Sequence, residues 1–145
     1  MRFLAIDLGD KRTGLAVGDD ATGMVGPAGM IDTPIGERNG EALLDALAKA
    51  VDEHIGPRDE MVIGLPVNMD GSEGPQAAKV RSFASRLGAR TGREIRFQDE
   101  RLTSVQADWS MARTGMTHKQ KKGRRDALAA AAILRDFLDA KASEE

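Results

Sequence analysis

The chain has 145 residues, the usual size of one domain, which is long enough to bury a hydrophobic core. It contains no cysteine, which excludes disulfide-stapled secreted scaffolds and thiolate metal sites, and no apolar run approaches the length of a membrane span. The net charge of −2 argues against a generally basic nucleic-acid binder. Because the acid Asp7 interrupts the first apolar run too early for a signal peptide, a cytoplasmic protein without membrane contact is expected.

The first third of the chain predicts a meander of short strands. Apolar runs at 3–6 and 13–17 flank a glycine-bearing turn at 9–12, which is typical of a hairpin. A third strand is expected near 24–31, although several glycine and proline residues weaken its pattern.

Helices and buried strands then alternate. The spacing of apolar residues predicts helices over 40–55 and 75–87, the second ended by Gly88, and strands over 61–65 and 95–98. Thr103 can cap a helix that runs to about residue 112.

A loop over 114–123 and a last helix over 124–140 complete the predicted elements. A hairpin followed by strand–helix–strand units implies an α/β fold with a mixed sheet flanked by helices. We expect one domain over residues 1–140 and a frayed tail over residues 141–145.

Two acids occupy positions that favour a buried site. Asp7 ends an apolar strand, where functional side chains of such sheets gather, although an acid that begins a turn is an equal alternative. Asp126 lies four residues before Ala130, on the apolar stripe of the last helix, so it should face the sheet. Interaction with the helix dipole explains an acid in the first turn but does not explain its place on the apolar face.

A third acid comes from the pair Asp99 and Glu100, which ends a strand. Alternation sends the two side chains to opposite faces, so only one can join a shared site, and the sequence leaves the choice open. The chain has only two histidines, so acids at separate element ends favour Mg²⁺ or Mn²⁺ over zinc. Asn68, Asp70 or Ser72 could contact a substrate, but a simple turn is the preferred interpretation of 69–72.

One short segment is strongly basic. Residues 113–125 hold six basic residues and no acid, while the rest of the chain has 15 basic and 23 acidic residues. Such a segment attracts phosphate and directly precedes Asp126, although a solvated charge run is the plain alternative. With aromatic residues at 3%, base stacking is a poor candidate for recognition. The candidate nucleic-acid contacts are Lys11, Arg12, Arg101, Lys119, Lys121, Lys122, Arg124 and Arg125.

Four segments, in order along nearly the whole chain, resemble the YqgF/RuvX family of pre-16S rRNA nucleases. They are IDLGDKRTGLAV at 6–17, IGLPVNMDGSE at 63–73, DERLT at 99–103, and KKGRRDALAAAAIL at 121–134. Gly18 and Ser104 stand where the family pattern suggests serine and threonine.

The resemblance implies an RNase H-like fold, with a five-stranded mixed sheet, related to Holliday-junction resolvases. It implies a Mg²⁺- or Mn²⁺-assisted nuclease that acts on the 5′ end of pre-16S rRNA in the pre-ribosome. Carried over to this chain, the catalytic and metal-binding acids are Asp7, Glu100 and Asp126, with Asp99 as the alternative to Glu100.

Three other functions are weighed against this one. A resolvase that cuts four-way DNA junctions would keep the chemistry and would need a stable homodimer, whereas the RNA enzyme could be a monomer. A non-catalytic RNA-binding assembly factor would use the basic segment alone. The pattern from Asp7 to Gly14 also resembles the phosphate loop of actin-like ATPases, which need two such domains.

Overall fold

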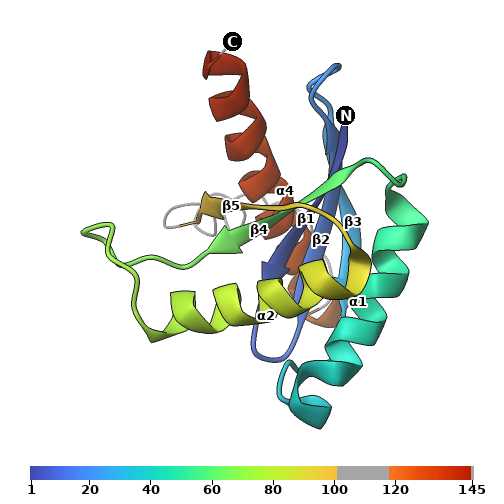
Figure 1. Ribbon diagram of the computed structural model, residues 1–145, viewed down its shortest axis with the longest axis vertical. Coiled ribbons are helices and arrows are strands. Elements are labelled where there is room, and N and C mark those ends of the chain that lie inside the picture. Colours follow the sequence, from blue (N-terminus) through green and yellow to red (C-terminus); the bar gives the residue numbers. More distant parts are fainter. Residues whose placement is uncertain (101–117, 145) are drawn as a thin grey trace.

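The computed structural model describes residues 1–100 and 118–144, with side chains of the last helix described from Gly123 onward. Figure 1 shows a sheet with α1 and α2 on one face and α4 on the other. The elements are β1 (Arg2–Leu8), β2 (Thr13–Asp19), β3 (Val25–Ile31), a 3-10 turn η1 (Glu37–Gly40), α1 (Glu41–His54), β4 (Glu60–Leu65), α2 (Pro75–Thr91), β5 (Ile95–Asp99) and α4 (His118–Glu144).

The sheet is mixed, as the sequence predicts, and its strand order is β3-β2-β1-β4-β5. β1, β2 and β3 form an antiparallel meander, whereas β1, β4 and β5 run parallel to one another. The carboxyl ends of β1, β4 and β5 therefore meet at one edge of the sheet, which is where parallel sheets collect functional side chains.

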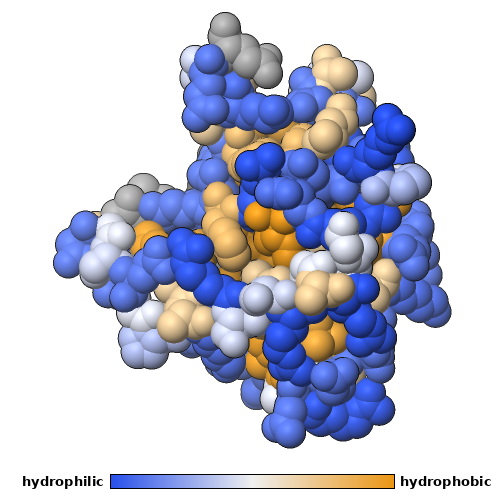
Figure 2. Space-filling view, in the orientation of Figure 1, coloured by the Kyte–Doolittle hydropathy of each residue, from blue (hydrophilic) through white to orange (hydrophobic). Residues whose placement is uncertain are grey.

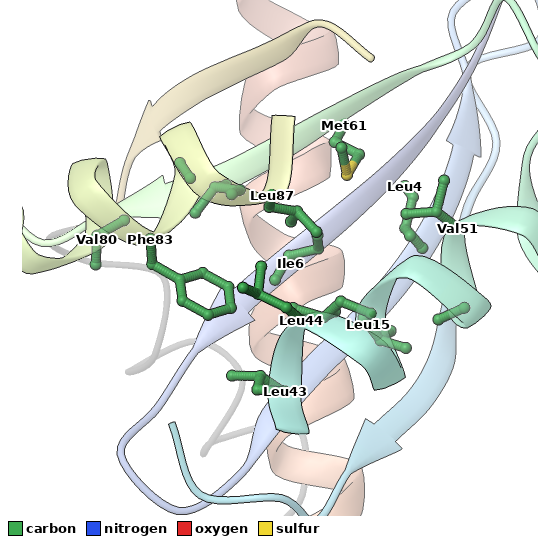
Figure 3. Packing of buried hydrophobic residues seen from close by; sticks show 14 of the residues in the cluster. Leu4, Ile6, Leu15, Leu43, Leu44, Val51, Met61, Val80, Phe83 and Leu87 are labelled. Atoms are coloured by element: carbon green, nitrogen blue, oxygen red, sulfur yellow. The ribbon is translucent and has the colours of Figure 1, made fainter. Parts of the chain in front are cut away.

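Two apolar layers hold the helices on the sheet. Leu4 and Ile6 of β1 point into the layer beneath α1 and α2, where Figure 3 shows Ile6 near Leu44 and Phe83. The alternate residue Phe3 belongs to the smaller layer beneath α4. Because side chains alternate along a strand, Asp7 points to the same face of the sheet as Phe3, which is the face that α4 covers.

Helix bounds differ from the predicted ones in two places. α2 continues through Gly88 and ends at Thr91, because Gly92 has the left-handed φ of +69° that terminates helices. Gly88 packs against β5, since an added Cβ would lie 3.5 Å from Cδ1 of Ile95. α4 begins at His118, inside the predicted loop, and includes residues 141–144 of the expected tail. The predicted helix over 103–112 lies outside the described residues.

No helix in the described part of the chain is long and apolar enough to cross a membrane.

Candidate active site

Asp7 lies near the end of β1 with a glycine beside it on each neighbouring strand. It pairs with Gly14 of β2, and the pairing of Ile6 with Ile63 brings Gly64 of β4 to its other side. Residues directly opposite in neighbouring strands point to the same face. The sheet surface around the Asp7 carboxylate is therefore free of flanking side chains, which leaves room for groups from outside the sheet.

The two glycines allow two further acids to approach Asp7. A Cβ added to Gly14 would lie 1.9 Å from the backbone oxygen of Asp126, so α4 rests directly on β2 at this point. A Cβ added to Gly64 would lie 2.5 Å from Oε2 of Glu100 and 2.5 Å from Cδ1 of Ile133. A side chain at either glycine would push an acid away from Asp7.

Glu100 comes directly after β5 and reaches back across the end of β4. Its backbone N–H donates to the carbonyl oxygen of Leu65 at 3.3 Å, and its carboxyl group shares a hydrogen bond with Asp7. Burial, together with the charge and hydrogen bond of Asp7 and the charge of Asp99, raises the pKa of Glu100 to about 8. At neutral pH the Glu100 carboxyl group therefore keeps its proton and donates a hydrogen bond to the Asp7 carboxylate.

Asp7 is affected by the same surroundings. Burial raises its pKa, the hydrogen bond from Glu100 lowers it, and the charge of Asp126 raises it again. These three acids thus form one electrostatic group, although they come from β1, from the end of β5 and from α4.

Asp126 is balanced by a cation. Nε of Arg12 donates to Oδ2 of Asp126 at 3.0 Å, and the two side chains are only 28% and 24% exposed. Arg12 lies in the turn between β1 and β2, where Gly9 N–H donates to its carbonyl oxygen at 3.0 Å. The ion pair therefore links the first turn of the chain to its last helix.

Of the two adjacent acids, it is Glu100 and not Asp99 that bonds to Asp7. The loop after β4 closes on itself, since Asn68 Nδ2 donates to Ser72 Oγ at 3.0 Å and Ser72 Oγ donates to Asp70 at 2.6 Å. These contacts agree with the interpretation of this segment as a turn.

The predicted nucleic-acid contacts lie partly within the described residues. Lys11, Arg124 and Arg125 are exposed, and Arg12 is half-buried in its pair with Asp126. Arg101 lies outside the described residues, as do the side chains of Lys119, Lys121 and Lys122.

A hollow that the sequence did not predict opens beside Glu100. A cavity of about 210 Å³ extends from Glu100 past Pro66 and Gln76 to Lys79 of α2. Lys79 Nζ lies 3.2 Å from Oδ1 of Asp10, and both side chains are at least half exposed. The apolar spacing of α2 marks its buried face only, so it gave no signal for a polar residue at the rim of a groove.

Three carboxylates offer the oxygen ligands that suit Mg²⁺ or Mn²⁺. No three acids or histidines in the described part of the chain already converge as a complete ligand cluster. The Asp7–Glu100 pair holds a proton on Glu100, and the carboxylate of Asp126 accepts a hydrogen bond from Arg12. The donor chemistry fits a hard cation, which would take the place of that proton and of the Arg12 contact.

The fold places the chain in a class. RuvC of Thermus thermophilus in complex with a Holliday junction substrate has a TM-score of 0.60 at 14% identity, covering 99% of this chain and 96% of that chain. A second RuvC structure from the same organism gives a TM-score of 0.54 at 16% identity, covering 99% and 97%. The architecture is therefore that of the RNase H-like proteins, as the sequence predicts.

The family follows from sequence comparison. The family model described as RuvX, Holliday junction resolvase, matches residues 1–140, and the chain belongs to this nuclease family. A relative from Anaeromyxobacter dehalogenans (strain 2CP-C) is 41% identical over 143 residues, covering 98% of this chain and 99% of its own length. An Escherichia coli relative is 36% identical over 137 residues, covering 94% and 95%. Both carry the provisional name pre-16S rRNA nuclease, and the predicted membership is confirmed.

Proposed function

We propose that this chain is a divalent-metal-dependent nuclease that processes the 5′ end of pre-16S rRNA, with Asp7, Glu100 and Asp126 as its catalytic and metal-binding acids. The observation that carries the assignment is the hydrogen-bonded pair of Asp7 and Glu100, with Asp126 close enough to raise the pKa of Asp7. Clusters of acids with shifted pKa values are typical of active sites. The names of the relatives support rRNA of the pre-ribosome as the substrate and the cytoplasm as the location.

Each acid has a distinct task in this proposal. Asp7 is fixed by β1 and the sheet on both sides, so it provides the rigid ligand. Glu100 would release its proton to solvent if a cation were bound, because the positive charge would oppose the burial and the charge of Asp7 that raise its pKa. Asp126 would supply the third carboxylate from α4, in exchange for its hydrogen bond from Arg12.

A bound Mg²⁺ or Mn²⁺ supplies activation of the attacking water and stabilises charge on the leaving oxygen. Arg12, once released from Asp126, can donate to a phosphate oxygen of the substrate, a pairing that suits the planar guanidinium group. Lys11, Arg124 and Arg125 are exposed and can hold the flanking phosphates.

A resolvase that cuts four-way DNA junctions is the second candidate, favoured by the description of the family model and by the likeness to RuvC. The two functions share the chemistry and differ in assembly. Two cuts at a fixed spacing need a symmetric homodimer, so a protein that stays monomeric at working concentration would count against the resolvase.

The test compares cleavage by the wild type and Asp7→Asn, on labelled pre-16S 5′ fragments and on four-way junctions. Each reaction is run with Mg²⁺, Mn²⁺, Ca²⁺ or EDTA. We expect cutting with Mg²⁺ or Mn²⁺ that Asp7→Asn abolishes, and faster cutting of the RNA. Faster cutting of the junction would identify the resolvase. Equal binding by both proteins without cutting of either substrate would contradict catalysis and favour an assembly factor that only binds RNA.

A further inference from the structure

A second cavity lies between η1 and α2 and continues the hollow beside Glu100. It has a volume of about 480 Å³, which is within the usual range for a small-ligand site. The two cavities share Asp10, Ile35 and Lys79 in their walls. They therefore form one groove that leads from the candidate active site along α2 to η1.

The outer wall of this groove is a strained loop that is held in place. Arg38 and Asn39 have φ angles of +50° and +54°, and Gly40 follows with +88°. Arg86 of α2 fastens this loop, since Nη1 donates to the carbonyl oxygen of Asn39 at 2.7 Å and Nη2 donates to Oε1 of Glu41 at 2.9 Å. Backbone strain of this kind persists only where surrounding contacts enforce it, and it gathers at ligand sites.

The groove combines an apolar lining with cations at its rim. Pro34, Ile35 and Phe83 supply apolar surface. Lys79 and Arg86 supply the cations of the lining, each in an exposed ion pair with an acid that a phosphate would have to displace. Figure 2 shows apolar surface between the hydrophilic side chains of α2 and those at the start of α1. A nucleotide matches this combination of apolar surface and cations, because the face of its base packs against apolar side chains and its phosphate binds a cation.

We propose that this groove binds an unpaired nucleotide of the substrate strand next to the bond that is cut. The inference rests on the proposed nuclease function and adds a preference for a single-stranded residue on one side of the cut. Continuity with the hollow at Glu100 selects the substrate strand itself as the occupant over a separate small molecule. The base lies against the apolar lining beneath η1, and its phosphate lies near Lys79.

The test fills the groove. Ser82 is exposed on α2 and lines the cavity, so Ser82→Trp occupies it without touching the core. Ser85→Trp is the matched control, because Ser85 is exposed on the same helix and lines a different groove beside Phe97. Binding is measured without cleavage, in EDTA, by the fluorescence anisotropy of a short single-stranded RNA and of a blunt RNA duplex.

We expect Ser82→Trp to weaken binding of the single strand by about tenfold and to leave duplex binding unchanged, since one base contact contributes about this much. Ser85→Trp should match the wild type. Equal binding of the single strand by all three proteins, or an equal loss for the duplex, would overturn the proposal.

Lys79→Met provides a second variant if Ser82→Trp does not fold. It should weaken single-strand binding. It should also reduce the slope of log affinity against log salt by the amount expected for the loss of one phosphate contact. An unchanged slope would contradict a phosphate near Lys79. Cleavage by Asp7→Asn and single-strand binding by Ser82→Trp together separate the two proposals. Loss of cleavage in Asp7→Asn with normal single-strand binding in Ser82→Trp upholds the active site and overturns the groove.

Discussion

Replacement of Gly14 by alanine tests the packing of α4 on the sheet at the candidate active site. The new Cβ would lie 1.9 Å from the backbone oxygen of Asp126 and 2.3 Å from its carbonyl carbon, whereas ordinary contacts begin near 3.4 Å. Both partners are backbone, one in a strand paired on both sides and one in a helix, so neither can rotate away. The helix and the sheet must separate by about 1.5 Å, which is the difference between the 1.9 Å approach to the Asp126 oxygen and an ordinary contact of 3.4 Å.

We expect this separation to cost about 3 kcal/mol, the upper end of the range for overpacked positions. It also moves Asp126 relative to Asp7, and a displacement of about 1 Å in a catalytic group, the role we propose for Asp126, lowers the rate by about 10²-fold. Urea unfolding gives the first quantity, and the cleavage rate at saturating metal gives the second.

Gly26→Ala is the matched control for Gly14→Ala. Gly26 lies in β3, the next strand of the sheet, has no heavy atom within 4 Å of an added Cβ and has no positive φ. Its replacement should change the free energy of unfolding by no more than about 1 kcal/mol. The argument is refuted if Gly14→Ala is as stable and as active as Gly26→Ala.

Three further substitutions test the charges and the core. In metal-free buffer the folded protein retains the proton of Glu100 that the unfolded chain releases, so stability should fall as the pH rises from about 4.5 to about 8. Glu100→Gln should flatten this decline in urea unfolding, and parallel declines in both proteins would contradict it. Arg12→Ala frees Asp126 from its ion pair, so calorimetry should show Mn²⁺ binding tightened by about threefold to fivefold, whereas weaker binding would be evidence against the competition. The Thr13 hydroxyl is fully buried and has no hydrogen-bond partner among the described residues, so Thr13→Val should raise the free energy of unfolding by about 1 kcal/mol and the melting temperature with it. A lower melting temperature would show that the hydroxyl is bonded.

Local patterns in the sequence were sufficient to place two of the three acids. Alternation along β1 puts Leu4 and Ile6 on one face and Asp7 on the other, and this depends only on strand geometry. The apolar stripe of α4 likewise points Asp126 to the sheet. Such periodicities are local, so the sequence alone contains them.

The other features of the site depend on contacts between distant segments. The choice of Glu100 over Asp99 follows from Gly64, which leaves space where β5 ends beside β4. The pairing of Arg12 with Asp126 spans 114 positions of the chain. No periodicity relates such residues, although a glycine inside the apolar run of β4 was a signal of close approach that the sequence analysis left unused.

The glycines near Asp7 also decide between two interpretations of the first motif. The pattern from Asp7 to Gly14 resembles a phosphate loop, in which glycines would let a nucleotide approach the backbone. Here Gly9 forms the turn that bonds to Arg12, and the space above Gly14 is filled by the backbone of Asp126. A nucleotide phosphate over Gly14 would have to displace α4 from the sheet. The same spacing that suggests nucleotide binding therefore lets α4 pack against β2 in this fold, which brings Asp126 close to Asp7, as the proposed metal site would need.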